Sequence, residues 1–312
     1  MNKISFEDLL TESFEEENND NYQYQDQQQD QSSLVDIVDH DILMHREIHF
    51  NGSFENMVKY YESKGLGCED DFSLESIKSL AQTEKDHKIN IKEALLNEGD
   101  CQDIEKFRSL YKKLLSANSG IAQMIANLVL SEDEERPLEI EALASSGETT
   151  LKWLIRLIEE EDFYSELSPG YGLAPLYATE CLGQIASPKS IPAIFEAADK
   201  NMEGAITALM KIGLPACQFL LKIIEHKTTD NDFNKAALIL SNFPNDKAIA
   251  QKSFLAASKI DPAKDSLALF YLSLCWGELD HKYSSEAKQI LKKVNEDDFF
   301  YQHIQDSLKL LK

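Results

Sequence analysis

The segment from Tyr171 to Lys200 constrains the fold more than any other part of the sequence. It predicts two short helices, because apolar residues recur at helical spacing on both sides of a tight turn at 186–190. Pro192 falls in the first turn of the second helix, where a missing N–H group is tolerated. Because so small a helix pair cannot bury its own apolar face, it needs further copies of itself on either side.

Such copies precede and follow this pair. The segment Ala205–Gly213 repeats the pattern of Ala178–Ala186, and the segment that begins at Gly147 matches the one that begins at Gly213 at a constant offset. A spacing of about thirty residues is typical of helical-repeat arrays. Two more pairs are predicted downstream, namely Asn234–Phe243 with Lys247–Lys259, and Ser266–Gly277 with Ser284–Val294.

The residues Leu182–Ile194, LGQIASPKSIPAI, resemble the short HEAT repeat, in the subtype described as phycobilisome-lyase-like. The resemblance covers Pro137–Val294, about half of the chain. It implies an α-solenoid that holds proteins along a curved surface; some members of the subtype are enzymes and many are scaffolds. The matching residues are packing residues, which carry a fold and no chemistry. We therefore expect an all-α fold, with an α-solenoid of HEAT-like helix pairs over residues 137–296.

The remainder of the chain is expected to form three further parts. Residues 1–32 are acidic and Gln-rich, and this composition predicts a disordered tail. Within the tail, the apolar and acidic stretch Ile4–Phe14 fits either a docking peptide or a frayed end. Residues 33–131 predict a helical N-terminal region, and residues 297–312 predict a capping helix for the array.

The composition excludes several classes of function. The net charge is −24 and no segment gathers Lys and Arg, so binding to nucleic acid through phosphate neutralisation is not expected. The sequence lacks both the run of about eighteen apolar residues that predicts a membrane span and the pattern of a secretory signal. Five widely spaced cysteines without a CxxC pair predict free thiols in a reducing cytoplasm.

A group of Asp and His residues is the main candidate for a metal site. Asp41, His45 and His49 lie four residues apart, with His40 beside them, so one helix face would present three metal ligands. The sequence H-R-E-I-H lacks the glutamate directly after the first histidine that the zincin motif needs. No second helix offers a matching ligand set. A solvated or capping histidine face is therefore the favoured alternative, and no metal or cofactor is predicted.

Motifs of catalysis are absent from the sequence, which has neither GxSxG nor a Gly-rich phosphate loop. The loop Ser168–Gly172 carries an aromatic residue, Tyr171, that we expect to be exposed. This loop fits either a recognition loop or a connection that redirects the chain into the next helix.

The resemblance to HEAT repeats also suggests where a partner binds, because the second helix of each pair lines the concave face of an array. Arg156 and Lys222 are equivalent in the repeat alignment, which would place two cations on one surface of an acidic protein. The residues expected near this surface are Trp153, Arg156, Glu196, Lys200, Lys222 and His226.

We therefore expect a non-catalytic, cytoplasmic scaffold or adaptor that binds protein partners through shape and charge complementarity. One alternative is a lyase-like HEAT enzyme or cofactor chaperone that holds a small molecule in its groove. Another is a bacterial effector or secretion-associated protein. The sequence identifies neither the partner nor the oligomeric state.

Overall fold

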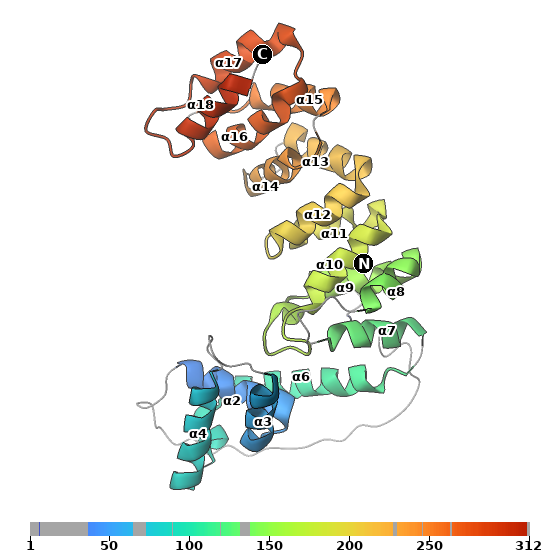
Figure 1. The fold of residues 1–312 in the computed structure, drawn as a ribbon, viewed down its shortest axis with the longest axis vertical. Helices are drawn as coiled ribbons and strands as arrows, with labels where there is room; N and C mark the ends of the chain where they lie inside the picture. The colour runs from blue at the N-terminus through green and yellow to red at the C-terminus, as the bar shows by residue number, and fades with distance from the viewer. Residues whose placement is uncertain are drawn as a thin grey trace. The chain divides into compact units, whose positions relative to one another are not determined.

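The computed structural model describes residues 6, 37–64, 73–88, 90–118, 120–131, 138–226, 230–244, 246–262 and 264–310. Within these residues every regular element is a helix, which confirms the all-α prediction (Figure 1). The predicted disordered tail, residues 1–32, lies outside the described residues except for Phe6, which is buried. Two compact units are present: unit 1 comprises residues 1–143 and 160–177, and unit 2 comprises residues 144–159 and 178–312.

Unit 1 contains the helices that the sequence predicts between residues 34 and 130. Ser53 and Ser73 directly precede helical patterns in the sequence, which predicts that they cap these helices. Both caps are present, because the Oγ atoms of Ser53 and Ser73 accept hydrogen bonds from Asn56 N (3.2 Å) and Ser76 N (3.1 Å). The elements are α2 (Ile37–Phe50), α3 (Phe54–Lys64), α4 (Leu74–His87), α5 (Ile91–Leu95), α6 (Glu98–Ser116), α7 (Gly120–Val129), most of α8 (Glu139–Ser145), η2 (Glu161–Tyr164) and the start of α10 (Ala174–Ile185).

The central helix of unit 1 is α2, which contacts α3, α4 and α6. Ile42 and Leu43 pack in one apolar cluster with α3, α4 and α5, whereas Met44 and Ile48 pack in a second cluster with α6. Because neighbouring helices cover α2 on several sides, its polar side chains are also removed from water. They must therefore find partners inside the protein.

Unit 2 contains helices at the positions that the repeat pattern predicts: α10, α12, α14 and α16 are the first helices of the predicted pairs, and α11, α13, α15 and α17 are the second helices. The elements are η1 (Gly147–Thr150), α9 (Leu151–Glu159), the rest of α10, η3 (Pro188–Ser190), α11 (Ile191–Ala197), α12 (Met202–Ile212), α13 (Leu214–His226), α14 (Asp230–Ser241), α15 (Lys247–Ala257), α16 (Ser266–Leu274), η4 (Cys275–Glu278), α17 (His281–Leu291) and α18 (Tyr301–Leu310).

Helices that lie two apart along the chain pack against each other in unit 2, as α9 does with α11, α13 with α15, and α14 with α16. The equivalent leucines Leu182 and Leu209 are both fully buried, as their repeat positions predict. Gly183 allows α10 and α12 to approach closely, because a Cβ atom at this position would lie 2.7 Å from the Cα of Ala208. The described helices include none that is long and apolar enough to cross a membrane alone; α12 and α13 together meet the length and composition criterion but bend by 118°.

Candidate functional site

The second helices of unit 2 carry the residues that the sequence places at a binding surface, but two of these residues are less available than expected. Trp153 on α9 is only 6% exposed, so its ring packs in the interior and offers little surface to a partner. Arg156 is partly buried, and its Nη1 lies 2.7 Å from Glu159 Oε2 on the same helix. The positive charge of Arg156 is therefore balanced locally.

The other four predicted residues are exposed. Glu196 lies on α11, Lys200 follows α11, and Lys222 and His226 lie on α13. Lys222 makes no ion pair with any described residue, unlike Arg156. Of the two cations that the repeat alignment makes equivalent, only Lys222 thus presents an unbalanced charge to solvent.

Charge is distributed unevenly between the first and second helices of unit 2. The second-helix set, α9, α11, α13, α15 and α17, holds seven Lys and Arg residues and four Glu residues, a net charge of +3. The first-helix set, α10, α12, α14 and α16, holds two Lys and four acidic residues, a net charge of −2. A chain with a net charge of −24 therefore concentrates positive charge on one set of helices.

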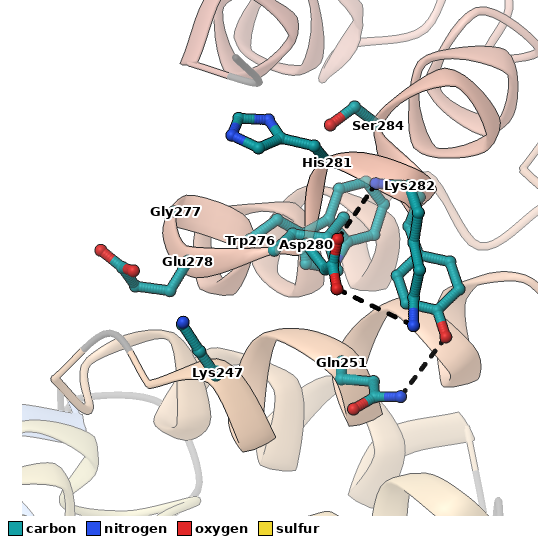
Figure 2. A pocket seen from close by; sticks show the side chains of 11 residues that line it. Lys247, Gln251, Trp276, Gly277, Glu278, Asp280, His281, Lys282 and Ser284 are labelled. Carbon is teal, nitrogen blue, oxygen red and sulfur yellow. Dashed lines mark hydrogen bonds and ion pairs between the residues drawn. The ribbon is translucent and has the colours of Figure 1, made fainter.

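A groove of about 500 Å³ lies where two of these second helices meet (Figure 2). Lys247 and Gln251 of α15 form one wall, and the first turn of α17 forms the other together with η4. Lys247 is exposed and makes no ion pair with any described residue. The remaining lining residues are Trp276, Gly277, Glu278, Leu279, Asp280, His281, Lys282, Tyr283 and Ser284.

Short-range contacts hold the walls of this groove in place. Asp280 caps α17, because its Oδ1 accepts a hydrogen bond from Lys282 N at 3.2 Å. Gln251 Nε2 donates to the hydroxyl of Tyr283 at 3.4 Å, and the Nζ of Lys282 lies 4.7 Å from the centre of the Tyr283 ring. The Tyr283 ring packs on Phe254 at 5.1 Å. The groove therefore presents a supported aromatic ring beside the ammonium group of Lys247, whereas the other lining ammonium group, that of Lys282, lies 3.8 Å from Asp280 Oδ2.

This combination suits binding to a chain segment that carries carboxylates. Ammonium groups and side-chain amides donate hydrogen bonds to carboxylate and carbonyl oxygens, and an aromatic ring packs against apolar parts of the same segment. The sequence also predicts the second helix at Lys247–Lys259, but the expected binding surface ends at His226 and so leaves out Lys247, Gln251 and Tyr283. A count of charges along every second helix would have found Lys247 together with Lys252 on α15.

The histidines of α2 do not form the solvated face that the sequence favours. His45 is 1% exposed, and its Nε2 lies 3.1 Å from the hydroxyl of Tyr61. His49 Nε2 lies 3.0 Å from the carbonyl oxygen of Leu167, to which only a protonated Nε2 can donate, so its Nδ1 accepts from the Tyr111 hydroxyl at 2.9 Å. The solvated interpretation is thus wrong for His45, because α2 is covered by its neighbours.

Burial also sets the charge state of these histidines. Desolvation lowers the pKa of His49 from 6.5 to about 4, although its hydrogen bond to Leu167 acts in the opposite direction. Burial, followed by the nearby His49, holds the pKa of His45 well below 6.5. Both rings are therefore neutral at physiological pH. Within the described residues, no three His, Cys, Asp or Glu side chains are arranged to hold a metal ion.

A buried ionic cluster lies beside the histidines and was not foreseen from the sequence. Glu47 is 4% exposed, and its carboxylate contacts Arg46 Nη2 at 2.8 Å, Lys92 Nζ at 3.1 Å and Arg108 Nη2 at 3.2 Å. Burial opposes ionisation of Glu47, but the hydrogen bond and charge of Lys92 and the charge of Arg46 outweigh it, so the pKa of this carboxyl group is lowered. The cluster joins α2 to α5 and α6 and serves the structure of unit 1.

The loop Ser168–Gly172 packs against the same part of unit 1. The Tyr171 ring stacks on His49, with ring centres 4.6 Å apart, and is partly buried rather than exposed. Gly170 has φ +80°, and a Cβ atom there would lie 1.8 Å from the carbonyl oxygen of Val129, so only glycine fits. These contacts support the interpretation of the loop as a fixed connection.

Comparisons of the chain with protein families, with characterised proteins and with solved structures gave no match. The resemblance to HEAT repeats therefore stays a prediction from sequence, and the functional argument rests on the geometry and charge of the residues described above.

Proposed function

We propose that unit 2 is a non-catalytic protein-binding array, a short α-solenoid of HEAT-like pairs whose second helices bind an acidic segment of a partner protein. The observation that carries this proposal is the net charge of +3 on the second helices of a chain whose net charge is −24. Lysines on a repeated surface attract an acidic partner over a distance, and opposite charges fix its position once bound.

The packing of unit 2 supports the array part of the proposal. Contacts between α9 and α11 and between α13 and α15 join second helices to second helices, as they do when helix pairs stack. The groove between α15 and α17 extends this set of helices and adds an aromatic side chain, Tyr283, to the cationic surface. A bound segment would then have one apolar contact among several ionic ones.

The test uses two exposed second-helix lysines that make no ion pair with a described residue, Lys222 and Lys247. The variant Lys222→Glu with Lys247→Glu is compared with Lys211→Glu with Lys264→Glu, which makes the same change in net charge at exposed lysines outside the second helices. The probe is a fluorescent poly-glutamate peptide, and binding is followed by fluorescence anisotropy at low salt. The wild-type chain should bind the probe, and added salt should weaken binding.

We expect the second-helix variant to bind the probe at least about tenfold more weakly, because each exposed ionic contact contributes up to about 1 kcal/mol and reversal adds repulsion. The control variant should change the affinity less than the second-helix variant does. If both variants weaken binding equally, only the overall charge matters and the proposed surface is wrong.

A small-molecule carrier is the second candidate, because a groove of about 500 Å³ lies within the range of small-ligand sites. The mostly polar and charged lining favours the peptide over such a ligand, since small-molecule sites are mainly apolar. Thermal-shift screening of the wild-type chain with anionic cofactors would favour this candidate if one of them stabilised the chain and Lys247→Glu abolished the effect.

A further inference from the structure

Phe6 lies buried in unit 1, although 154 positions separate it in sequence from its main hydrogen-bond partner. Its side chain is 0% exposed, and its ring meets Phe163 edge to face, with ring centres 4.9 Å apart. Its backbone N–H donates to Glu160 Oε1 at 2.6 Å. The contacts that hold this phenylalanine from the acidic beginning of the chain thus include an edge-to-face aromatic contact and a hydrogen bond to a carboxylate.

The receiving site belongs to the body of unit 1 and has its own supports. Phe163 lies in the short helix η2 and is itself 2% exposed. The helix η2 begins at Glu161. Asp162, which directly precedes Phe163, forms an ion pair with Lys106 of α6, and 2.6 Å separate Asp162 Oδ2 from Lys106 Nζ. Contacts other than those with Phe6 therefore hold this site in place.

Phe6 is joined to the rest of unit 1 through a long stretch of chain, unlike the site that receives it. Residues 7–36 separate Phe6 from the start of α2, and thirty residues of chain can span up to about 100 Å. The chain connection to α2 therefore does not by itself keep Phe6 next to Phe163. The interactions of Phe6 with the site have to hold it there. An aromatic side chain in a pocket, with a backbone hydrogen bond beside it, is how short linear segments bind folded domains.

We propose that the Phe163 and Glu160 site is a docking site for a short phenylalanine-containing segment, and that the residues around Phe6 occupy it in cis. The same sequence presented by a second molecule binds the site when the cis segment is removed. This answers the question that the sequence leaves open for Ile4–Phe14 in favour of a docking peptide, with the chain itself as its first receptor.

The strength of the interaction can be bounded. The composition of residues 15–32 predicts a flexible tether, for which the effective concentration is in the millimolar range. A segment docked in cis through such a tether must have a dissociation constant in trans below about 1 mM. A free peptide must compete with the tethered copy in the wild-type chain. Its apparent affinity there should fall by the ratio of that effective concentration to its dissociation constant, about tenfold if the constant is about 0.1 mM.

The experiment uses the full chain and a labelled peptide of residues 1–14, MNKISFEDLLTESF. Fluorescence anisotropy should show binding to the Phe6→Ala chain and about tenfold weaker binding to the wild-type chain. A peptide with Phe6→Ala should lose binding. The control is a peptide of the same composition in scrambled order, which should not bind.

Salt separates this site from the cationic surface of unit 2. The peptide carries three acidic residues and one lysine, and its site contains Glu160 and adjoins Glu161 and Asp162, so added salt should maintain or strengthen peptide binding by screening repulsion. Binding of poly-glutamate to unit 2 should weaken under the same conditions. Failure of one proposal is therefore distinguishable from failure of the other.

Three outcomes would overturn the proposal. Equal binding, or no binding, of the peptide to the wild-type and Phe6→Ala chains would show that Phe6 does not occupy a separable docking site. Loss of the helical circular dichroism signal in Phe6→Ala would show that Phe6 is an integral part of the core. Hydrogen exchange of the isotopically labelled wild-type chain gives a check without mutation. Saturating peptide should accelerate hydrogen exchange in residues 1–14 of the chain, because it displaces them from the site. An unchanged rate would refute this displacement.

Discussion

Replacing Gly183 by alanine tests how α10 and α12 pack, and the expected sign of its effect is opposite to that of the same change on an exposed helix. The new Cβ atom would lie 2.7 Å from the Cα and 2.9 Å from the Cβ of Ala208. Nonbonded carbon atoms rest at about 3.5–4.0 Å, so the two helices have to separate by about 1 Å. Because one of the clashing atoms belongs to the backbone of α12, no side-chain rotation relieves the contact.

The magnitude follows from two opposing effects. Overpacking a buried contact costs about 1–3 kcal/mol, and contact with a backbone atom favours the upper part of this range. Alanine stabilises a helix by about 1 kcal/mol relative to glycine. We therefore expect Gly183→Ala to lower the free energy of unfolding of unit 2 by about 1–2 kcal/mol.

The assay is urea denaturation followed by tryptophan fluorescence, which reports on unit 2 because Trp153 and Trp276 are the only tryptophans of the chain and both lie in this unit. The control is Thr207→Ala on an exposed position of α12, which should change the stability by less than about 0.5 kcal/mol. Adding Ala208→Gly to Gly183→Ala should restore part of the loss, because it removes one of the two close contacts. A gain in stability for Gly183→Ala would refute the close packing of α10 on α12.

Two further predictions concern unit 1, with far-UV circular dichroism during urea denaturation as the measurement. Acidification from neutral pH to pH 4 should destabilise unit 1 by about 3 kcal/mol through His49. In the unfolded chain His49 takes up its proton near pH 6.5, whereas in the folded chain it does so only at about pH 4. The contribution of neutral His49 to stability is therefore complete above pH 6.5 and is lost as the pH falls towards 4. In the His49→Gln variant the stability of unit 1 should depend less on pH. A dependence as steep as that of the wild type would show that other groups cause it. Glu47→Gln should cost about 3 kcal/mol, the lower end of the range for breaking a buried ion pair, because the buried Arg46 then keeps only Glu84 as a carboxylate partner. Glu55→Gln, in an exposed pair with Lys59, is the control and should leave the denaturation midpoint unchanged; a similarly small effect at Glu47 would show that solvent reaches its cluster.

The buried ionic cluster shows why the sequence pattern could not predict which polar residues of unit 1 are buried. The helical spacing of Ile42, Leu43, Met44 and Ile48 identifies α2, but it does not show that several helices cover it. Once these apolar residues pack against α3, α4 and α6, the polar residues between them are enclosed as well. Arg46 and Glu47 then depend on partners from distant helices, which no local pattern reveals.

Short-range order, by contrast, was predictable from the sequence alone. The helix pairs of unit 2, the caps at Ser53 and Ser73, and the burial of Leu182 and Leu209 follow from apolar periodicity and capping chemistry, which act over a few residues. The tertiary structure decided which side chains meet across long stretches of chain. It placed Tyr171 on His49, and it brought Phe6 to Phe163. It also formed the groove at Lys247 from two helices and the segment between them. These contacts join residues that are far apart in sequence, and their positions depend on the packing of whole helices, so periodicity within one helix carries no information about them.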